Sequence, residues 1–395
     1  MASKNKSKIP HRRRHSFFYR LLRPLVILFL KIKFGYKYRK AKNLGKDNYI
    51  VLSNHTTDYD PIFVASSFNR PMYFVGSEHI TRWNVAYKLL NFAFSPIVRY
   101  KGSVASCTVK DILRRVRGGA NVCIFAEGVR SWDGETNPIL PSTAKLIKSA
   151  KCGLVTYKLT GGYFVSPNWS EGNGTRKGRI QGAPVNYYTK EQLSQMPEEE
   201  IYNIITKDLY ENAYLTQYKL RSKYKGKGLA EKLENLIFIC PKCKSHDTLH
   251  SHDNTITCSN CKLEFKYNEY GEIEGLKEKN IFALSNWQKN EVLNNFKNNI
   301  IYTCQNATLS TLSNDHKKTT LLEGELSLSP QSLKCGDQEF DVKDIVDIAI
   351  FGRHGIVFSH DNTYYEVVPD KNCSAYKFVL YYKTIIDANK DKKSC

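Results

Sequence analysis

The sequence predicts an α/β fold, in which a mixed, largely parallel sheet with flanking helices occupies the first half of the chain. Strand-type and helix-type runs alternate from Tyr49 to Tyr188, as they do when helices connect parallel strands. A helix is expected at SCTVKDILRRVRGG, because its apolar residues share one face and two glycines end it. The runs that we expect to be strands are YIVLS, MYFVG, NVCIFA, GLVTYKL and GRIQGAPV.

Charge is distributed unevenly along the 395 residues, which are enough for two or three domains. The net charge is +21, yet residues 301–395 carry 11 basic and 13 acidic residues, a balance of −2, so the other 300 residues carry +23. Residues 1–46 contain 15 basic residues and no acidic one. This basic arm is expected to meet an anionic surface, either nucleic acid or membrane lipid.

The arm also has an apolar face. Between Ser16 and Phe34 the residues at helical spacing are Phe18, Leu21, Leu22, Leu25, Leu28, Phe29 and Ile32. The longest apolar run is only seven residues, against the roughly 20 that span a bilayer, and no signal-peptide cleavage site follows. We therefore expect an interfacial amphipathic helix at the cytoplasmic face of a membrane, which Pro24 could divide in two. The alternative is a surface helix packed on its own domain.

Four of the eleven cysteines form two CxxC pairs, Cys240 with Cys243 and Cys258 with Cys261, separated by 14 residues. Four thiolates at this spacing predict a zinc ribbon with structural Zn²⁺, in a reducing, intracellular compartment. The closed site leaves no open position for catalysis, and the alternative is a metal-free or redox-active dithiol. The intervening histidines are expected to be solvated, although one could replace a cysteine ligand; they are His246, His250 and His252.

The chain is thus expected to contain five regions. They are the basic arm (1–46), the α/β domain (47–236), the zinc ribbon (237–270), a helical linker (271–300) and a β-rich C-terminal domain (301–390). The last region combines several strand-type runs with a final helix, and in this pattern it resembles PH-like (GRAM-like) domains.

Polar residues gather where the expected strands end. His55 and Asp60 follow YIVLS, Glu127 and Arg130 follow NVCIFA, and Arg99 ends a further candidate strand. Because the carboxyl ends of parallel strands lie at one edge of a sheet, these side chains are expected to converge there. His55 and Asp60 can meet only if His55 precedes the helix, since residues i and i+5 of a helix lie about 140° apart.

These residues resemble the hallmarks of the 1-acylglycerol-3-phosphate acyltransferases and related glycerolipid acyltransferases. Asn54-His55-Thr56-Thr57-Asp58-Tyr59-Asp60 matches NH-x-[ST]-x-x-D, and Phe125-Ala126-Glu127-Gly128-Val129-Arg130-Ser131 matches F-P-E-G-x-R-S. The likeness covers roughly residues 16–188. Ala126 and Thr156 stand where the family has proline, so the resemblance leaves the identity of the acceptor open.

The resemblance implies an O-acyltransferase of phospholipid biosynthesis, for which no catalytic cofactor is expected. His55 would be the general base and Asp60 its orienting carboxylate. The acceptor, most simply 1-acylglycerol-3-phosphate, would be held by residues that include two arginines for its phosphate: Arg99, Glu127, Gly128, Arg130 and Ser131. The hydroxyl of the acceptor would attack the thioester of acyl-CoA or an acyl carrier protein directly, and the chain has no G-x-S-x-G nucleophile motif.

Other interpretations remain open at this point. Asp60 could cap a helix whose first turn contains Pro61, and Arg130 could pair with Glu127 on the surface. Another lyso-lipid or an amino-lipid could be the acceptor, and Arg176, Lys177 and Arg179 could contact an anionic carrier or headgroup. A protein of another class, a zinc-ribbon nucleic-acid-binding protein, would explain the charge but not the two motifs, so no nucleic-acid partner is expected.

Overall fold

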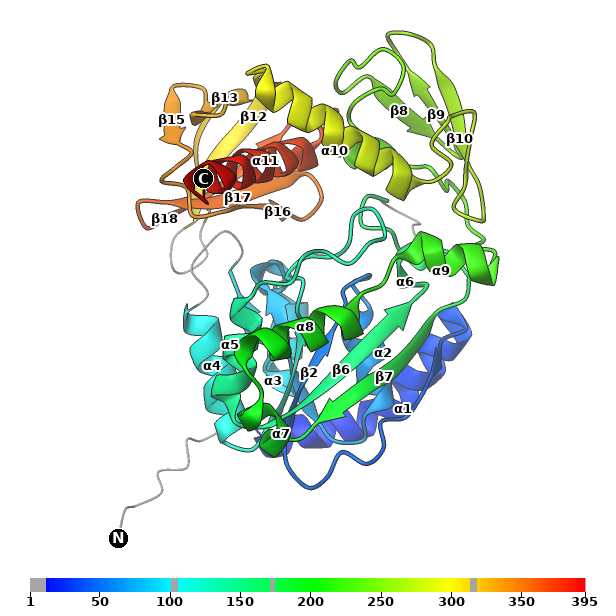
Figure 1. The fold of residues 1–395 in the computed structure, drawn as a ribbon, viewed down its shortest axis with the longest axis vertical. Coiled ribbons are helices and arrows are strands. Elements are labelled where there is room, and N and C mark those ends of the chain that lie inside the picture. The colour runs from blue at the N-terminus through cyan, green and yellow to red at the C-terminus, as the bar shows by residue number, and fades with distance from the viewer. Residues whose placement is uncertain (1–11, 101–105, 171–174, 313–317, 395) are drawn as a thin grey trace.

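The computed structural model describes residues 12–100, 106–170, 175–312 and 318–394, and residues 1–11 of the predicted arm lie outside this part of the chain (Figure 1). The strands within these ranges form three sheets. In Figure 1 the first sheet and its helices form the lower part, and the two antiparallel sheets lie above it.

The first sheet confirms the mixed, largely parallel prediction. Its strands are, in spatial order, β1 (Lys37–Tyr38), β7 (Gln181–Tyr188), β6 (Gly153–Thr160), β2 (Tyr49–Ser53), β5 (Asn121–Phe125), β3 (Met72–Ser77) and β4 (Ile97–Arg99). Strands β6, β2, β5, β3 and β4 pair in parallel, whereas β7 is antiparallel to β6. The carboxyl end of β2 therefore lies in the middle of the sheet, between those of β5 and β6.

Helices cover both faces of this sheet. Successive residues of β2 point to opposite faces, so that Ile50 and Leu52 join one apolar cluster and Tyr49 and Val51 join the other. The first cluster is covered by α4 (Ser106–Arg117), α5 (Ser142–Ala150) and α8 (Glu198–Leu209), and the second by α1 (Arg12–Phe34) and α2 (Asp60–Ser67). The remaining helices here are η1 (Glu78–Arg82), α3 (Val85–Phe94), α6 (Gly162–Val165), α7 (Lys190–Gln195), α9 (Ala213–Leu220) and η2 (Leu233–Asn235).

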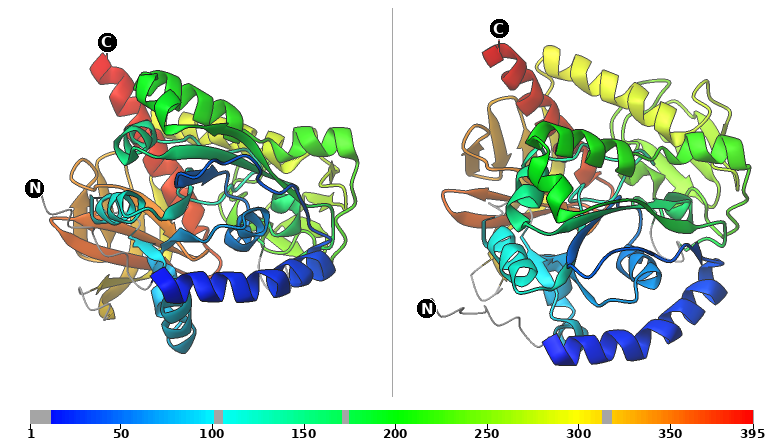
Figure 2. Two further views of the ribbon diagram at one scale, coloured as in Figure 1. Left: turned by 90° about the horizontal axis from the view of Figure 1, so that it is seen from below. Right: turned by 60° about the horizontal axis from the view of Figure 1, so that its bottom comes forward.

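Helix α1 runs along the outside of the domain (Figure 2). It continues through Pro24, so the prediction that this proline could divide it was wrong. One face is anchored, because the hydroxyl of Tyr19 donates to the carbonyls of Ala65 and Phe68 at the end of α2. Among the residues that the structure describes, no helix is long and apolar enough to cross a bilayer.

The cysteine ribbon is a small antiparallel sheet next to a long helix. Its strands are β8 (Leu249–His252), β9 (Thr255–Cys258), β10 (Glu264–Tyr267) and β11 (Ile273–Glu274), and α10 (Ile281–Lys297) follows it. The last region is a curled antiparallel sheet, whose closing helix α11 (Ala375–Ser394) packs on its strands. Its spatial order is β15 (Gln338–Asp341), β14 (Ser332–Cys335), β13 (Lys318–Leu328), β12 (Tyr302–Leu312), β18 (Thr363–Pro369), β17 (Gly355–His360) and β16 (Ile348–Phe351). The closer likeness to PH-like domains stays a prediction.

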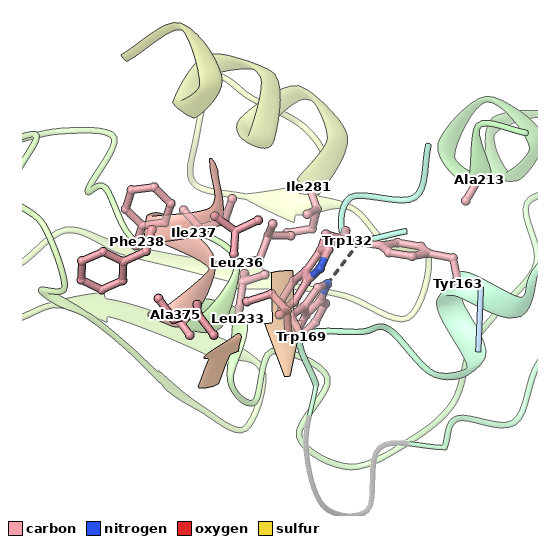
Figure 3. Packing of buried hydrophobic residues seen from close by; sticks show 14 of the residues in the cluster. Trp132, Tyr163, Trp169, Ala213, Leu233, Leu236, Ile237, Phe238, Ile281 and Ala375 are labelled. Carbon is pink, nitrogen blue, oxygen red and sulfur yellow. Dashed lines mark hydrogen bonds between the residues drawn. The ribbon is translucent and has the colours of Figure 1, made fainter. Parts of the chain in front are cut away.

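A continuous apolar core passes through the predicted boundaries between these regions. Trp132, from the loop after β5, stacks on Tyr376 of α11 with ring centroids 4.6 Å apart. Figure 3 shows Trp132 and Trp169 beside Leu233, Leu236 and Ile281. Next to Trp132, the carboxylate of Asp133 accepts hydrogen bonds from two residues of α10, Ser285 (3.1 Å) and Lys289 (2.7 Å). The loop after β5 is therefore fixed by the C-terminal half of the chain.

Candidate active site

The loop between β2 and α2 brings His55 and Asp60 together. Strand β2 ends at Ser53 and α2 begins at Asp60, so His55 precedes the helix as expected. Nδ1 of His55 lies 2.8 Å from Oδ2 of Asp60, and the imidazole stacks on Phe125 at a centroid distance of 4.5 Å. Because a carboxylate accepts hydrogen bonds, Nδ1 carries the ring proton, and Nε2 keeps a lone pair that can accept a proton. The His55 side chain is 21% exposed, so the ring is accessible from solvent.

Asp60 is completely buried, and four further donors compensate for the burial of its charge. Its Oδ2 accepts from the backbone N–H groups of Thr56 and Thr57, and its Oδ1 accepts from their two hydroxyls. All these donors precede α2, and the N-cap residue of this helix is Tyr59, without a side-chain capping bond. The contacts of Asp60 are thus those of a residue that orients His55, rather than those of a helix cap.

Asn54 fixes the start of this loop. Its side-chain amide donates to the carbonyl of Leu159 (2.9 Å) and accepts from the N–H of the same residue (2.8 Å). The buried side chain therefore continues the pairing of β2 with β6 for one residue beyond the strand. On the other side, the N–H of Ala126 donates to the carbonyl of Ser53 (3.3 Å), a bond that proline at this position could not make.

Glu127, a residue of the second motif, holds the loop between β2 and α2 in place through hydrogen bonds. Its Oε1 accepts from the N–H of His55 (2.6 Å), and its Oε2 accepts from the backbone (2.6 Å) and side chain (2.9 Å) of Asn137. Burial raises the pKa of Glu127 to about 8, against the opposite effect of these N–H donors. These contacts position His55 and do not pair the carboxylate with Arg130. Sequence reasoning missed Asn137, because nothing in its neighbourhood forms a motif.

The glycine and the serine of the second motif shape the same turn. Gly128 has φ +72°, a backbone conformation that favours glycine, and a Cβ there would meet nothing within 4 Å. The N–H of Ser131 donates to the carbonyl of His55 (3.0 Å), and its hydroxyl accepts from the N–H of Gly134 (2.9 Å). The predicted contact of Gly128 and Ser131 with substrate stays a prediction.

Arg130 reaches the His55 loop with a guanidinium that is only 9% exposed. Its Nη1 lies 3.3 Å from Oδ2 of Asp58, whose side chain is 68% exposed, and its Nη2 donates to Oδ1 of Asn168 (2.5 Å). Nη1 is buried and has no hydrogen-bond partner among the described residues. Burial lowers the pKa of Arg130. A buried guanidinium whose ion-pair partner is largely exposed to solvent is suited to an anionic ligand.

Arg99 does not join this group. It ends β4, which β5 and β3 separate from β2, a displacement of about 14 Å across three strand spacings. Burial lowers the pKa of Arg99, while the charges of Glu78 and Asp347 act in the opposite direction. The side chain thus lies where β4 meets the C-terminal sheet, and its predicted role in binding phosphate stays a prediction.

The structure also places Arg176 and Thr156, two positions that the sequence singles out. Arg176, offered as a contact for an anionic carrier, is buried and donates to the carbonyl of Leu229 (2.6 Å), with its guanidinium over the ring of Trp169. It is therefore not available to a carrier. Thr156, at a family proline position, is buried in β6 and donates to Oδ2 of Asp208 (2.7 Å).

The four cysteines of the ribbon converge, with all four sulfur atoms within 4.8 Å of one another. The Sγ atoms of Cys240 and Cys261 lie 3.7 Å apart, and those of Cys243 and Cys258 lie 3.8 Å apart. A tetrahedron with Zn–S bonds of about 2.3 Å has edges of about 3.8 Å, whereas a disulfide would need about 2.05 Å. The cluster fits a tetrahedral metal ion.

The two turns that hold these cysteines are alike. Lys244 and Lys262 each follow the second cysteine of a pair, each has φ +59°, and each donates its N–H to the first cysteine. Equivalent turns thus present the two pairs to the centre of the cluster. His250 and His252 are exposed, as expected. The expectation was wrong for His246, which is half-buried and lies 3.3 Å from the side-chain amide of Asn295, because the ribbon packs against α10.

Part of this chain is similar to a known protein family. Residues 35–160 match the model of the acyltransferase family. The chain contains an acyltransferase domain. The match includes both motifs, together with β1 to β6 and the His55–Asp60 pair that they position.

A search of solved structures finds the crystal structure of the 1-acyl-sn-glycerophosphate (LPA) acyltransferase PlsC from Thermotoga maritima. The likeness has a TM-score of 0.41 and 15% identity, and it covers 52% of this chain and 82% of that chain. No curated protein matches the sequence.

Proposed function

We propose that this protein is a peripheral membrane enzyme that transfers an acyl chain from acyl-CoA or an acyl carrier protein to 1-acylglycerol-3-phosphate. The observation that carries the proposal is the His55–Asp60 pair, 2.8 Å apart at the end of β2 within the acyltransferase domain. It leaves Nε2 of His55 as a base, and Asp58 of the same loop pairs with the buried guanidinium of Arg130.

The reaction needs only this base and a bound alcohol. Nε2 of His55 takes the proton of the glycerol hydroxyl while its oxygen attacks the thioester carbonyl, and Asp60 stabilises the imidazolium that forms. When the tetrahedral intermediate collapses, the C–S bond breaks and the imidazolium returns the proton to the leaving thiolate. Glu127 acts as a positioning residue, because it holds the backbone of His55.

Arg130 is the residue that we assign to the acceptor phosphate. A phosphate monoester offers several oxygens to the two arms of a guanidinium. Nη1 makes no hydrogen bond among the described residues and has an ion pair with the largely exposed Asp58 at 3.3 Å, so a phosphate oxygen can compete with that carboxylate for this arm. Another lyso-lipid or an amino-lipid acceptor is the alternative.

The test is acyl transfer to a panel of lyso-lipids, with products identified by mass spectrometry. We expect the largest kcat/KM for 1-acylglycerol-3-phosphate, and slower transfer to the matching monoacylglycerol, which lacks the anionic group for Arg130. Equal rates on these two acceptors would contradict the assignment of a phosphate acceptor. Absence of transfer to every lyso-lipid would contradict the proposed function itself.

Helix α1 is proposed to place the site at the membrane. Although its inner face is anchored, it leaves a row of large apolar side chains exposed: Phe17, Leu21, Leu25, Leu28, Phe29 and Ile32. Helix α3 packs beside it and adds Val85, Leu89 and Phe92. The basic residues Arg12, Arg13, Arg20 and Lys31 are exposed on the same helix, which suits the headgroups of anionic lipids.

Replacing two residues of this face with charges should release the protein from anionic vesicles. Leu25 and Ile32 are 62% and 71% exposed, so Leu25→Glu with Ile32→Glu should leave the fold intact. Burial of two such side chains in lipid is worth roughly 3 kcal/mol or more, so we expect vesicle affinity to fall about 100-fold in co-sedimentation. Leu215→Glu, on the exposed face of α9, is the matched control.

Unchanged co-sedimentation of the double variant would exclude this face as the membrane contact. Retention of the wild type on DNA at physiological salt, without binding to vesicles, would favour the nucleic-acid alternative. Deletion of α1 is a poorer test, because it also removes Tyr19, Leu30 and Phe34 from the core.

Structural zinc is proposed for the cysteine cluster. Cys240, Cys243, Cys258 and Cys261 would occupy all four tetrahedral positions, so the ion would stabilise the ribbon and take no part in acyl transfer.

A further inference from the structure

One turn of the C-terminal sheet reaches the candidate active site. Arg353 lies between β16 and β17, directly after Gly352, which has φ +63°. Its Nε donates to the backbone carbonyl of Asn168 (3.0 Å), in the segment after α6. Arg353 is the only arginine among the 95 residues from 301 to 395.

Asn168 accepts hydrogen bonds from two guanidinium groups, those of Arg353 and Arg130. It is buried, and while its carbonyl accepts from Arg353, its side-chain Oδ1 accepts from Nη2 of Arg130. Burial has the largest effect in lowering the pKa of Arg130, and the positive charge of Arg353 lowers it further. The two cations therefore lie close enough to repel each other.

Little negative charge balances this pair. Arg130 forms its ion pair with Asp58, which is largely exposed to solvent, and Arg353 forms none with any of the described residues. The negative charge of Asp60 also acts on Arg130, but its effect is smaller than those of Asp58 and Arg353. Partial desolvation of the two cations costs free energy, which an incoming dianion would recover.

The turn that carries Arg353 is held in place by a separate contact. The guanidinium of Arg82, on η1, lies 4.0 Å above the ring of Phe351 and pairs with the buried Glu366 at 2.8 Å. The ring of His79, also on η1, meets Phe351 at 5.3 Å. The position of Arg353 beside Arg130 is thus fixed by the packing of the C-terminal sheet on the acyltransferase domain, independently of its bond to Asn168.

We propose that Arg353 is a substrate-binding residue, which supplies the second guanidinium for the phosphate monoester of the acceptor. This rests on the proposed function and deepens it: the acceptor site is completed by the C-terminal sheet, from outside the acyltransferase domain. The sequence predicts Arg99 as the second phosphate-binding arginine, and Arg353 is proposed in addition to it. A phosphate monoester has three terminal oxygens, enough to accept from one arm of each arginine.

The test compares Arg353→Gln with Arg353→Lys and a control, Lys334→Gln. Lys334 is an exposed cation on β14 of the same sheet, so its loss changes the net charge equally. With 1-oleoylglycerol 3-phosphate as acceptor, Arg353→Gln should raise KM about 10- to 100-fold, the effect of one charged hydrogen bond. KM for the acyl-CoA donor should not change, Arg353→Lys should restore part of the loss, and Lys334→Gln should match wild type.

A purely structural role for Arg353 predicts a different result. If the residue only fastens the turn to Asn168, Arg353→Gln should lower the melting temperature and change donor and acceptor KM alike, which would overturn the proposal. An unchanged acceptor KM would also overturn it, while acyl transfer by the wild type would keep the proposed function standing.

If no acyl transfer is found, measurements of lipid binding can still test the role of Arg353 separately from the proposed function. In a His55→Ala background, binding of 1-oleoylglycerol 3-phosphate and of 1-oleoylglycerol can be measured by calorimetry in phosphatidylcholine vesicles. Selective loss of the phosphate-bearing lipid on Arg353→Gln supports the site even without turnover. If the protein binds the two lipids equally well, both with Arg353 and with Arg353→Gln, the proposal for Arg353 is overturned.

Discussion

His55→Ala is expected to lower kcat for acyl transfer by about 10²- to 10⁴-fold, because it removes the proposed general base. KM for the acceptor should change little, since the phosphate contacts are proposed for other residues. The ring is partly exposed and packs on one face of Phe125, so the melting temperature should stay close to that of the wild type. Initial rates with saturating acyl-CoA, together with thermal unfolding, check both expectations.

His250→Ala is the matched control, because this histidine is exposed on β8 of the ribbon. It should turn over at the wild-type rate. If His55→Ala also keeps that rate, the proposed mechanism is wrong.

Asp60→Asn extends the same test to the partner of His55. From the sequence alone, asparagine would be expected to keep the fold, but Asp60 accepts from five donors through both oxygens. An amide NH₂ would face some of these donors, so we expect a stability loss of about 1–3 kcal/mol in addition to the loss of rate. If Asp60 acts through His55, the substitution should lower the rate much less in a His55→Ala background. Additive losses of rate in the double variant would contradict this dependence.

Loss of the metal is expected to have the largest effect on the fold. Cys240→Ser with Cys258→Ser removes one ligand from each pair, and the purified variant should lose the single zinc ion per chain expected in the wild type. Structural zinc contributes about 10–16 kcal/mol to the folding of isolated zinc-finger peptides, so the ribbon should unfold locally. Elemental analysis and thermal unfolding measure these outcomes, with the exposed Cys107→Ser as control.

The same variant also tests whether the ion takes part in catalysis. Because four cysteines leave no open position, KM and kcat per folded molecule should be retained below the unfolding temperature. A fall in kcat without a change in melting temperature would contradict a structural ion. Wild-type protein without zinc would contradict the metal site altogether.

The parts of the site that sequence could predict are those set by local chain geometry. His55 and Asp60 meet because a strand ends before one and a helix begins at the other, and their spacing reflects that junction. The parallel order of β2 and β5 then brings Glu127 to His55. Periodicity and motif spacing contain this information.

The remaining contacts depend on the packing of distant segments, which no local pattern encodes. Asn137 and Asn168 come from loops without a motif, and Arg353 comes from another sheet. The sequence sets Arg353 apart in one way only: it is the single arginine of residues 301–395, whose other cationic residues are lysines. Arg176 shows the opposite error, because a basic residue in a polar loop can be buried against aromatic rings.

The anchoring of Trp132 and Asp133 on α10 and α11 has a consequence for how this enzyme can be divided. A fragment ending near residue 236 would retain both motifs, yet it would uncover the aromatic faces of Trp132 and Trp169 and leave the carboxylate of Asp133 without Lys289. Exposed aromatic patches of this kind promote aggregation. Grafting residues 35–160 into another protein would meet the same difficulty, so the catalytic portion is not an interchangeable module.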